Sequence, residues 1–139
     1  MNLKDVSDLL VAEEGEILSA YQDHLGYWTI GVGRLIDKAK GGGITKVESR
    51  YLLANDIARF ELKALGYPWY ADLDEVRQGV IVCMLFQLGS LDKWQNFRAA
   101  LTAKDWASAK ISMLNSKWAR QTPARAKRMA KIMETGVWR

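Results

Sequence analysis

The chain has 139 residues, of which 49% are hydrophobic and 26% charged, with one cysteine and one histidine. This predicts one folded domain rather than a disordered chain, and argues against an internal disulfide or a structural zinc site. The net charge of +4 combines a charge of −5 over residues 1–30 with +6 over residues 116–139, and the basic end would attract an anionic polymer such as nucleic acid, anionic lipid or bacterial wall.

No apolar run reaches the length of about 18 residues that a membrane-spanning helix needs, so we expect no integral membrane segment. The first residues, MNLKDVSDLLVAEEGE, lack a basic region followed by a long apolar stretch and therefore do not look like a secretory signal. We expect a protein that is made and folds in the cytoplasm. Cys83 lies in the apolar run VIVCMLF, which favours a buried, inert thiol.

The chain begins with a pattern typical of a short amphipathic helix over residues 3–13, which places Glu14 at the helix end. Residues 17–21 and 27–32 are rich in β-branched and aromatic residues. The polar, glycine-containing segment 22–26 separates them. This arrangement predicts a β-hairpin.

Three glycines at 41–43 break the pattern, and Thr45 with Glu48 then forms a capping box that opens a second helix. This helix should run to about residue 65, stop at Gly66-Tyr67-Pro68 and join two lobes. Its predicted apolar stripe consists of Val47, Leu52, Leu53, Ile57 and Phe60.

The rest of the sequence predicts helices only. Asp74 or Asp72 can cap a helix that runs to Leu88 and is closed by Gly89, and its residues 80–86 are apolar all round, which favours a buried central helix. Further helices are expected at about 91–101 and 104–115, and from the Thr122-Pro123 start to about Thr135, before Gly136.

Two carboxylates flank the predicted hairpin. Eight residues separate Glu14 from Asp23, and five separate Asp23 from Thr29. Cleavage of a glycosidic bond needs such a pair, because one carboxylic acid protonates the leaving oxygen while a carboxylate activates water or attacks the sugar. On spacing alone, acidic residues at helix ends and in turns are more often simply solvated.

The sequence around these residues resembles the catalytic segment of the phage-type lysozymes, glycoside hydrolase family 24, which include the lysozymes of T-even phages. That pattern is a Glu, eight residues, an Asp, five residues and a Thr followed by Ile-Gly-x-Gly, and Gly31-Val32-Gly33 completes it here. Residues 82–89 and 118–138 resemble the family's central helix and C-terminal helix. The two glycines themselves predict bends or close backbone approach, and without a following helix they do not indicate a phosphate loop.

The resemblance implies an α+β fold, mostly helical and two-lobed, with an active-site cleft between the lobes. The small lobe would span about residues 12–65 and hold the hairpin, and the helical lobe residues 1–11 and 66–139. Matched to the family, Glu14 is the general acid, Asp23 the base that activates water, and Thr29 the residue that positions this water. The same matching implies that Leu35 and Phe86 touch the glycan, that Phe97 and Ser112 occupy two further glycan-contact positions, and that Arg125 pairs with Glu14.

Several positions depart from the family. Arg34 stands where relatives carry a histidine, so an ion pair there would not change with pH near neutrality. The segment 36–44 is shorter than in longer relatives. Phe97 and Ser112 are not the residue types expected at those contacts, and Phe86, at the end of an apolar helix, could equally be a core residue.

The implied activity is hydrolysis of the bond between N-acetylmuramic acid and N-acetylglucosamine in bacterial peptidoglycan by a monomer, without metal or organic cofactor and without nucleic acid. As an endolysin the enzyme would wait in the host cytoplasm until a separate holin-type pore-former opened the membrane. Two alternatives stay open: a lytic transglycosylase that uses Glu14 but does not need Asp23, and a non-catalytic basic module that binds wall or nucleic acid.

Overall fold

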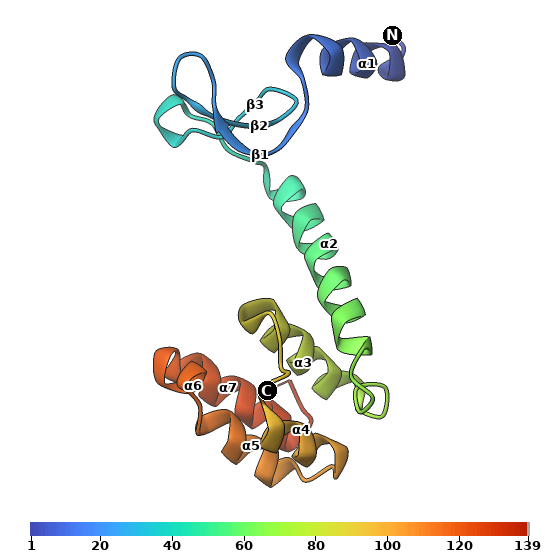
Figure 1. Ribbon diagram of the computed structural model, residues 1–139, viewed down its shortest axis with the longest axis vertical. Coiled ribbons are helices and arrows are strands. Elements are labelled where there is room, and N and C mark those ends of the chain that lie inside the picture. Colours follow the sequence, from blue (N-terminus) through green and yellow to red (C-terminus); the bar gives the residue numbers. More distant parts are fainter. Residues whose placement is uncertain (139) are drawn as a thin grey trace. The chain divides into compact units, whose positions relative to one another are not determined.

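The structure is a computed structural model that describes residues 1–138, and the chain divides into two compact units, residues 1–52 and residues 53 onward (Figure 1). The boundary falls inside α2 (Lys46–Leu65), the helix that the sequence predicted as a connection. Residues 1–11 make their contacts within the first unit. Their place in the helical lobe stays a prediction. The combination of a small sheet with helices confirms the α+β class.

Unit 1 contains the sheet. Besides the first part of α2, its elements are α1 (Leu3–Glu14), β1 (Ile17–Gln22), β2 (Trp28–Gly31), β3 (Arg34–Leu35) and the 3-10 turn η1 (Lys38–Lys40). The three strands are antiparallel in the order β1-β2-β3, so β2 is central. Both predicted strands are confirmed. The two-residue strand β3 was not predicted, because it is too short to show a period.

The ends of α1 follow from its sequence. Asn2 caps the first turn, where its Oδ1 accepts hydrogen bonds from the backbone N–H groups of Lys4 and Asp5 at 3.0 and 3.2 Å. Gly15 ends the helix at a φ of +74°, and its N–H donates to the carbonyl of Val11 at 2.9 Å. Glu14 is therefore the last helical residue, as predicted.

The predicted capping box at the start of α2 is present. Thr45 Oγ1 accepts from the N–H of Glu48 at 3.1 Å, and Glu48 Oε1 accepts from the N–H of Thr45 at 2.9 Å. Arg34 of β3 adds an ion pair to Glu48 at 2.7 Å. Together with the Thr45 hydrogen bonds, the Arg34 guanidinium lowers the pKa of Glu48 to about 2.

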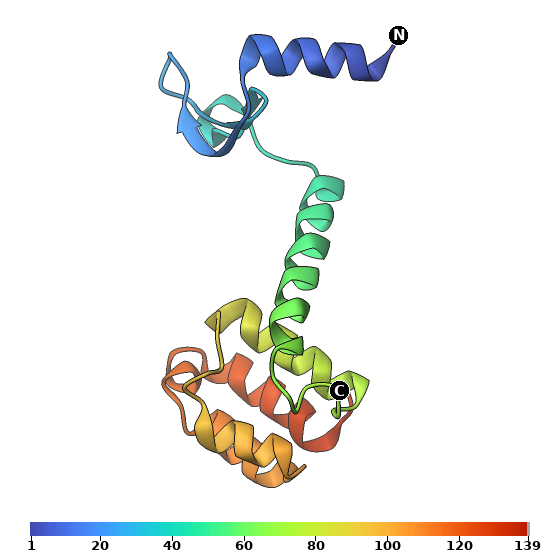
Figure 2. The same ribbon diagram turned by 45° about the vertical axis from the view of Figure 1, so that its right-hand side comes forward.

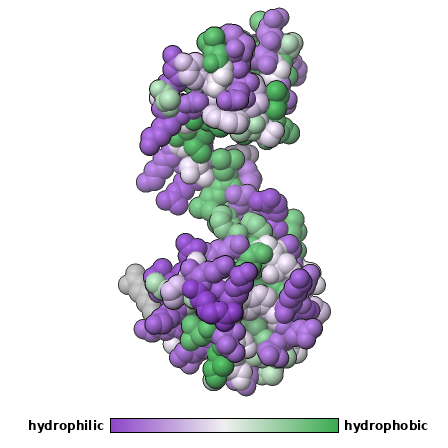
Figure 3. Space-filling model, turned by 60° about the vertical axis from the view of Figure 1, so that its left-hand side comes forward, coloured by the Kyte–Doolittle hydropathy of each residue, from purple (hydrophilic) through white to green (hydrophobic). Residues whose placement is uncertain are grey.

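The predicted apolar stripe of α2 is largely exposed. Val47 is 80% exposed, Leu52 52% and Ile57 43%, whereas Phe60 is partly buried against the core of unit 2. Apolar surface is visible over α2 in Figure 3. The 3.6-residue period correctly predicted the helix, while the burial of its stripe is confirmed only at its C-terminal end.

Unit 2 is helical (Figures 1 and 2). It also holds the hydrophobic core. Its elements after α2 are α3 (Glu75–Leu88), α4 (Gln95–Thr102), α5 (Trp106–Leu114), α6 (Lys117–Gln121) and α7 (Pro123–Thr135). Helix α7 packs against α3 and α5, and α4 packs against α5. The largest fully buried side chains are Val80, Ile81, Met84, Leu85, Leu91, Phe97, Leu101, Met113 and Met133.

The prediction that α3 is buried all round is wrong on one face. Val80, Ile81 and Leu85 are buried, but Cys83 and Phe86 are exposed. The buried-thiol prediction is thus corrected. The remaining partial burial still raises the pKa of the Cys83 thiol, which disfavours the reactive thiolate.

The later helices match the sequence with three differences. Helix α4 begins at Gln95 rather than near residue 91, and the five-residue helix α6 was not predicted. Pro123 does open α7, but Thr122 makes no capping bond to it. Instead the Thr122 hydroxyl donates to the carbonyl of Trp118 at 2.9 Å. Gly136 ends α7 with a left-handed φ of +72°, as predicted.

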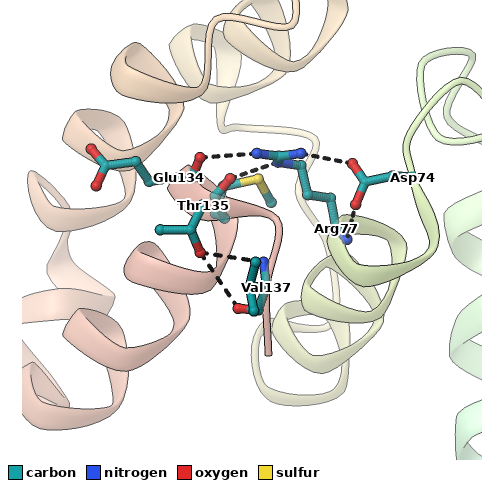
Figure 4. Close-up of polar contacts among 6 residues, drawn as sticks. Asp74, Arg77, Glu134, Thr135 and Val137 are labelled. Carbon is teal, nitrogen blue, oxygen red and sulfur yellow. Dashed lines mark hydrogen bonds and ion pairs between the residues drawn. The ribbon is translucent and has the colours of Figure 1, made fainter. Parts of the chain in front are cut away.

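A buried arginine closes the C-terminal end of α7 (Figure 4). Arg77 of α3 donates to the carbonyls of Met133 and Glu134 at 2.7 and 2.9 Å, which α7 itself leaves without helical partners. Its guanidinium pairs with Asp74 at 2.9 Å and lies 3.9 Å from the ring centroid of Trp106. One side chain therefore ties α3, α5 and α7 together.

No helix within residues 1–138 combines the length and the apolar character that a membrane span requires.

Candidate active site

Unit 1 contains a pocket of about 480 Å³ that brings together the three residues predicted to act on substrate. Glu14, Asp23 and Thr29 all line it, and so does Leu35, the predicted glycan contact of this unit. The other lining residues are Tyr21, His24, Leu25, Tyr27, Gly33 and Lys40.

The floor of the pocket is one face of the sheet. Thr29 on the central strand pairs with Tyr21 of β1 on one side and with Leu35 of β3 on the other. Directly opposed residues of neighbouring strands point to the same face, and residues two apart on one strand do so as well. This explains why Tyr27, two residues before Thr29, also lines the pocket.

Glu14 reaches the pocket from the end of α1, where the chain turns at Gly15. Its carboxylate lies over Gly33, and a Cβ added to Gly33 would be 3.3 Å from Glu14 Oε2. Gly33 has a φ of +65°, which only glycine adopts at little cost. The predicted close approach at the second glycine of the pattern is therefore confirmed, and the approaching group is the predicted general acid.

Asp23 is fixed in the turn between β1 and β2. Its Oδ1 accepts from the backbone N–H groups of Leu25 and Tyr27 at 2.9 and 2.8 Å. Two such bonds to one oxygen set the orientation of the carboxylate. Within residues 1–138, Oδ2 has no hydrogen-bond partner and is available to a ligand or water.

Thr29 is only 5% exposed. Its hydroxyl donates to the carbonyl of Tyr27 at 3.0 Å, so its single proton is used and its lone pairs can accept a hydrogen bond from a water. This geometry suits a residue that holds a water molecule, and the role itself stays a prediction.

The remaining predicted residues belong to unit 2. Phe86 is 46% exposed, with its ring 5.5 Å from that of Phe60, so it is a surface residue rather than part of the core. Phe97 and Ser112 line a second pocket of about 580 Å³. Phe97 is only 1% exposed and forms part of its wall. Arg125 is exposed on α7, and its pairing with Glu14 stays a prediction.

Sequence reasoning missed five residues of the first pocket: Tyr21, His24, Leu25, Tyr27 and Lys40. Alternation along the strands could have identified the two tyrosines, because Tyr21 precedes Asp23, and Tyr27 precedes Thr29, by two positions. Lys40 lies in η1, which has no periodic pattern, so nothing in the sequence placed it near the carboxylates.

Two carboxylates and a hydroxyl in one pocket can perform acid–base hydrolysis of a glycosidic bond. The pocket does not need a metal ion for this chemistry. Among residues 1–138 no group of three or more His, Cys, Asp or Glu side chains is arranged to hold one.

Comparison with known proteins agrees with this chemistry. The family model "Phage lysozyme" matches residues 11–133. "Probable T4-type lysozyme 1" and "Probable T4-type lysozyme 2" of Dictyostelium discoideum are 31% and 30% identical, each over 97% of this chain and 96% of the relative. "Pre-baseplate central spike protein Gp5" of Enterobacteria phage T4 is 30% identical over 94% of this chain, which covers 28% of that protein. The chain therefore belongs to the phage lysozyme family and is a lysozyme-type glycoside hydrolase.

Proposed function

We propose that this chain is a muramidase that hydrolyses the β-1,4 bond between N-acetylmuramic acid and N-acetylglucosamine in bacterial peptidoglycan. The observation that carries the proposal is the convergence of Glu14, Asp23 and Thr29 on one pocket. Membership of the phage lysozyme family supports the same class of substrate.

In the proposed mechanism Glu14 donates a proton to the glycosidic oxygen, and the bond from that oxygen to the anomeric carbon breaks. A water molecule attacks this carbon and gives its proton to Asp23. The hydrogen bonds support these roles. Oδ1 of Asp23 is held by two backbone N–H groups, and a water that gives one proton to Oδ2 would donate its other proton to the Thr29 hydroxyl.

Unit 2 would contribute binding rather than chemistry. The exposed ring of Phe86 and the second pocket, which Ser112 and Phe97 line, are the surfaces that we assign to glycan. Arg125 would pair with Glu14. The exposed basic residues of α7, Arg128 and Lys131 among them, would hold the anionic wall.

The biological role that fits this activity is cytolysis. We propose that the protein acts as a monomeric endolysin, resides in the host cytoplasm, and reaches the periplasmic wall after a holin-type protein has permeabilised the membrane. Its partner is then peptidoglycan rather than nucleic acid.

The test is lysis of permeabilised Gram-negative cells, with mass analysis of the released fragments. Glu14→Gln and Asp23→Asn keep side-chain shape but remove proton transfer, and each should lower the rate by about 10²–10⁴-fold. Glu13→Gln is the matched control, because this neighbouring carboxylate does not line the pocket and its loss should leave the rate within about twofold of wild type.

The products separate the alternatives. Reducing-end fragments support hydrolysis, whereas 1,6-anhydro ends formed without any need for Asp23 would indicate a transglycosylase. If the wild-type protein itself releases no products, and its wall binding falls steeply with salt and is unchanged by Glu14→Gln, the chain is a non-catalytic basic module.

A further inference from the structure

The pocket of Glu14 and Asp23 contains one lysine that the proposed mechanism does not use. Lys40 lines it together with the two carboxylates. It is the last residue of η1, in the segment between β3 and α2. Lys38, in the same turn, does not line the pocket.

Hydrogen bonds fix the backbone of this turn to the sheet. Asp37 caps it through Oδ1, which accepts from the N–H of Ala39 at 3.0 Å, while Oδ2 accepts from the N–H of Trp28 at 3.1 Å. The carbonyl of Trp28 in turn accepts from Ile36 and Asp37 at 2.9 and 3.0 Å. Lys40 therefore starts from a defined position beside β2 rather than from a loose loop.

The chain is also closely packed just after the turn, at Gly42, where no side chain would fit. A Cβ added to Gly42 would lie 2.8 Å from the backbone nitrogen of Asp37 and 2.8 Å from the carbonyl oxygen of Leu35. This packing holds η1 directly against the end of β3, whose Leu35 lines the pocket.

The Lys40 ammonium is directed by an aromatic ring. Its Nζ lies 4.9 Å from the ring centroid of Tyr27, a half-buried residue of the same pocket. A cation–π contact at this distance restricts the lysine without neutralising it. None of the five ion pairs within residues 1–138 involves Lys40, so its charge is not balanced by a carboxylate of the described chain.

We infer that Lys40 binds a carboxylate of the substrate and so selects acidic glycans over neutral ones. The inference rests on the proposed function, since it concerns the ligand of the same pocket. The carboxylate of Asp23, which acts as a base and is therefore ionised, repels an anionic ligand. The Lys40 ammonium in the same pocket offsets this repulsion, and its three donors can form a charge-assisted hydrogen bond to such a ligand.

The carboxylate has two sources in peptidoglycan: the lactyl group of muramic acid where the peptide is absent, and the peptide stem where it is present. A neutral glycan offers neither. Lys40 would thus add specificity, which is a difference between affinities, without taking part in bond cleavage.

Binding to the Glu14→Gln protein, measured by calorimetry, tests this without turnover. Three tetrasaccharides of alternating N-acetylglucosamine and N-acetylmuramic acid serve as ligands: one with free lactyl carboxylates, one with these converted to carboxamides, and one that carries peptide stems. Each is titrated into Glu14→Gln alone and into this variant with Lys40→Gln or, as the matched control, Lys38→Gln.

Of the two ligands that carry carboxylates, Lys40→Gln should weaken the binding of one by about 2–5-fold, the range of an exposed ion pair. Binding of the carboxamide ligand should not change. An effect confined to the peptide-free ligand assigns the lactyl carboxylate, and one confined to the peptide-bearing ligand assigns the stem. Lys38→Gln should change none of them.

Equal weakening of the acidic and the carboxamide ligands would overturn the inference and give Lys40 a general role in the pocket. No weakening at all, or the same weakening with Lys38→Gln, would overturn it too. If none of the three ligands binds while Lys40 is intact, the proposed substrate is wrong, and the inference fails with it.

Discussion

At Gly33 the backbone takes a φ of +65°, and an added Cβ would lie 3.3 Å from Oε2 of Glu14. Gly31, two residues earlier, has nearly the same φ of +67° but nothing within 4 Å of an added Cβ. The two glycines therefore have similar conformational needs, and only one of them also makes room for a predicted catalytic group.

This pair separates strain from site geometry. Gly33→Ala and Gly31→Ala should each lower the free energy of unfolding by about 1–2 kcal/mol, the cost of a left-handed alanine. Gly33→Ala alone should displace the Glu14 carboxylate and lower kcat by roughly tenfold or more, since small misplacements of a reacting group are costly. Urea denaturation measures the free energy of unfolding of each variant, and initial rates on soluble wall fragments measure its kcat. Equal rates in the two variants would mean that the close approach of Glu14 to Gly33 does not affect catalysis.

Asp23 and Thr29 together lead to a prediction about stereochemistry. A carboxylate that attacks sugar directly needs no residue to hold water, whereas a general base does, and inverting glycosidases leave space for that water between their carboxyl groups. The Thr29 hydroxyl has lone pairs free to accept from it. We expect inversion, so NMR of the first product from the β-linked glycan should show the α-anomer before mutarotation. A β-anomer would make Asp23 the nucleophile.

At the scale of single elements, Arg77 and Arg59 form a natural comparison. Each pairs with an aspartate three residues earlier, Arg77 with Asp74 and Arg59 with Asp56, and each lies over an aromatic ring. They differ in burial, because the side chain of Arg77 is 11% exposed and that of Arg59 68%. Only Arg77 bonds to carbonyls of another helix.

Arg77→Met should lower the free energy of unfolding by about 2–4 kcal/mol, because it leaves two carbonyls at the end of α7 without donors. Arg59→Met should cost at most about 1 kcal/mol, as exposed ion pairs do. Chemical denaturation of both variants gives the comparison. Similar losses would mean that the cross-helix bonds of Arg77 contribute little.

The capping box of α2 predicts an acid-sensitive contact. The pKa of Glu48 is lowered from 4.5 to about 2, mainly by its hydrogen bond with Arg34. A lowered folded-state pKa means that ionised Glu48 contributes stability above pH 4.5, and that this contribution is lost as the pH falls through about 2. Arginine keeps its charge throughout this range.

Carbon NMR of the Glu48 carboxyl group during an acid titration measures this directly. The midpoint should lie near 2 in the wild-type protein. Arg34→Gln should move it upward, while hydrogen bonding from Thr45, whose backbone N–H donates to Glu48 Oε1, keeps it below its ordinary value. A wild-type midpoint at 4.5 would show that neither Arg34 nor Thr45 lowers the pKa of Glu48 in the folded protein.

At the scale of the whole molecule, the parts that could be predicted are those with a local cause. The hairpin, the capping box of α2 and the ends of α3 and α7 follow from short patterns of residues. The spacing of Glu14, Asp23 and Thr29 could be matched to a family because the turn and strand between them fix where each side chain points.

The parts that could not be predicted depend on contacts between distant residues. An apolar run such as residues 80–86 has no period that distinguishes a face, so it could not indicate that Cys83 and Phe86 are exposed. The position of Lys40 depends on hydrogen bonds between Asp37 and Trp28, nine residues apart. Neither arrangement leaves a signal in a single sequence.

The uneven distribution of charge leads to a last prediction. Arg128 and Lys131 are exposed on α7 in the basic end of the chain. Surface charge acts on the encounter with an anionic polymer, over about 8 Å at physiological salt. Reversing both to Glu should therefore slow lysis of whole walls at low salt and barely change cleavage of short soluble fragments. Reversing Lys46 and Arg50, exposed on α2, changes the net charge equally and should slow wall lysis less. Equal losses with both pairs would assign the effect to net charge alone, and equal losses on walls and fragments would contradict a role in wall association.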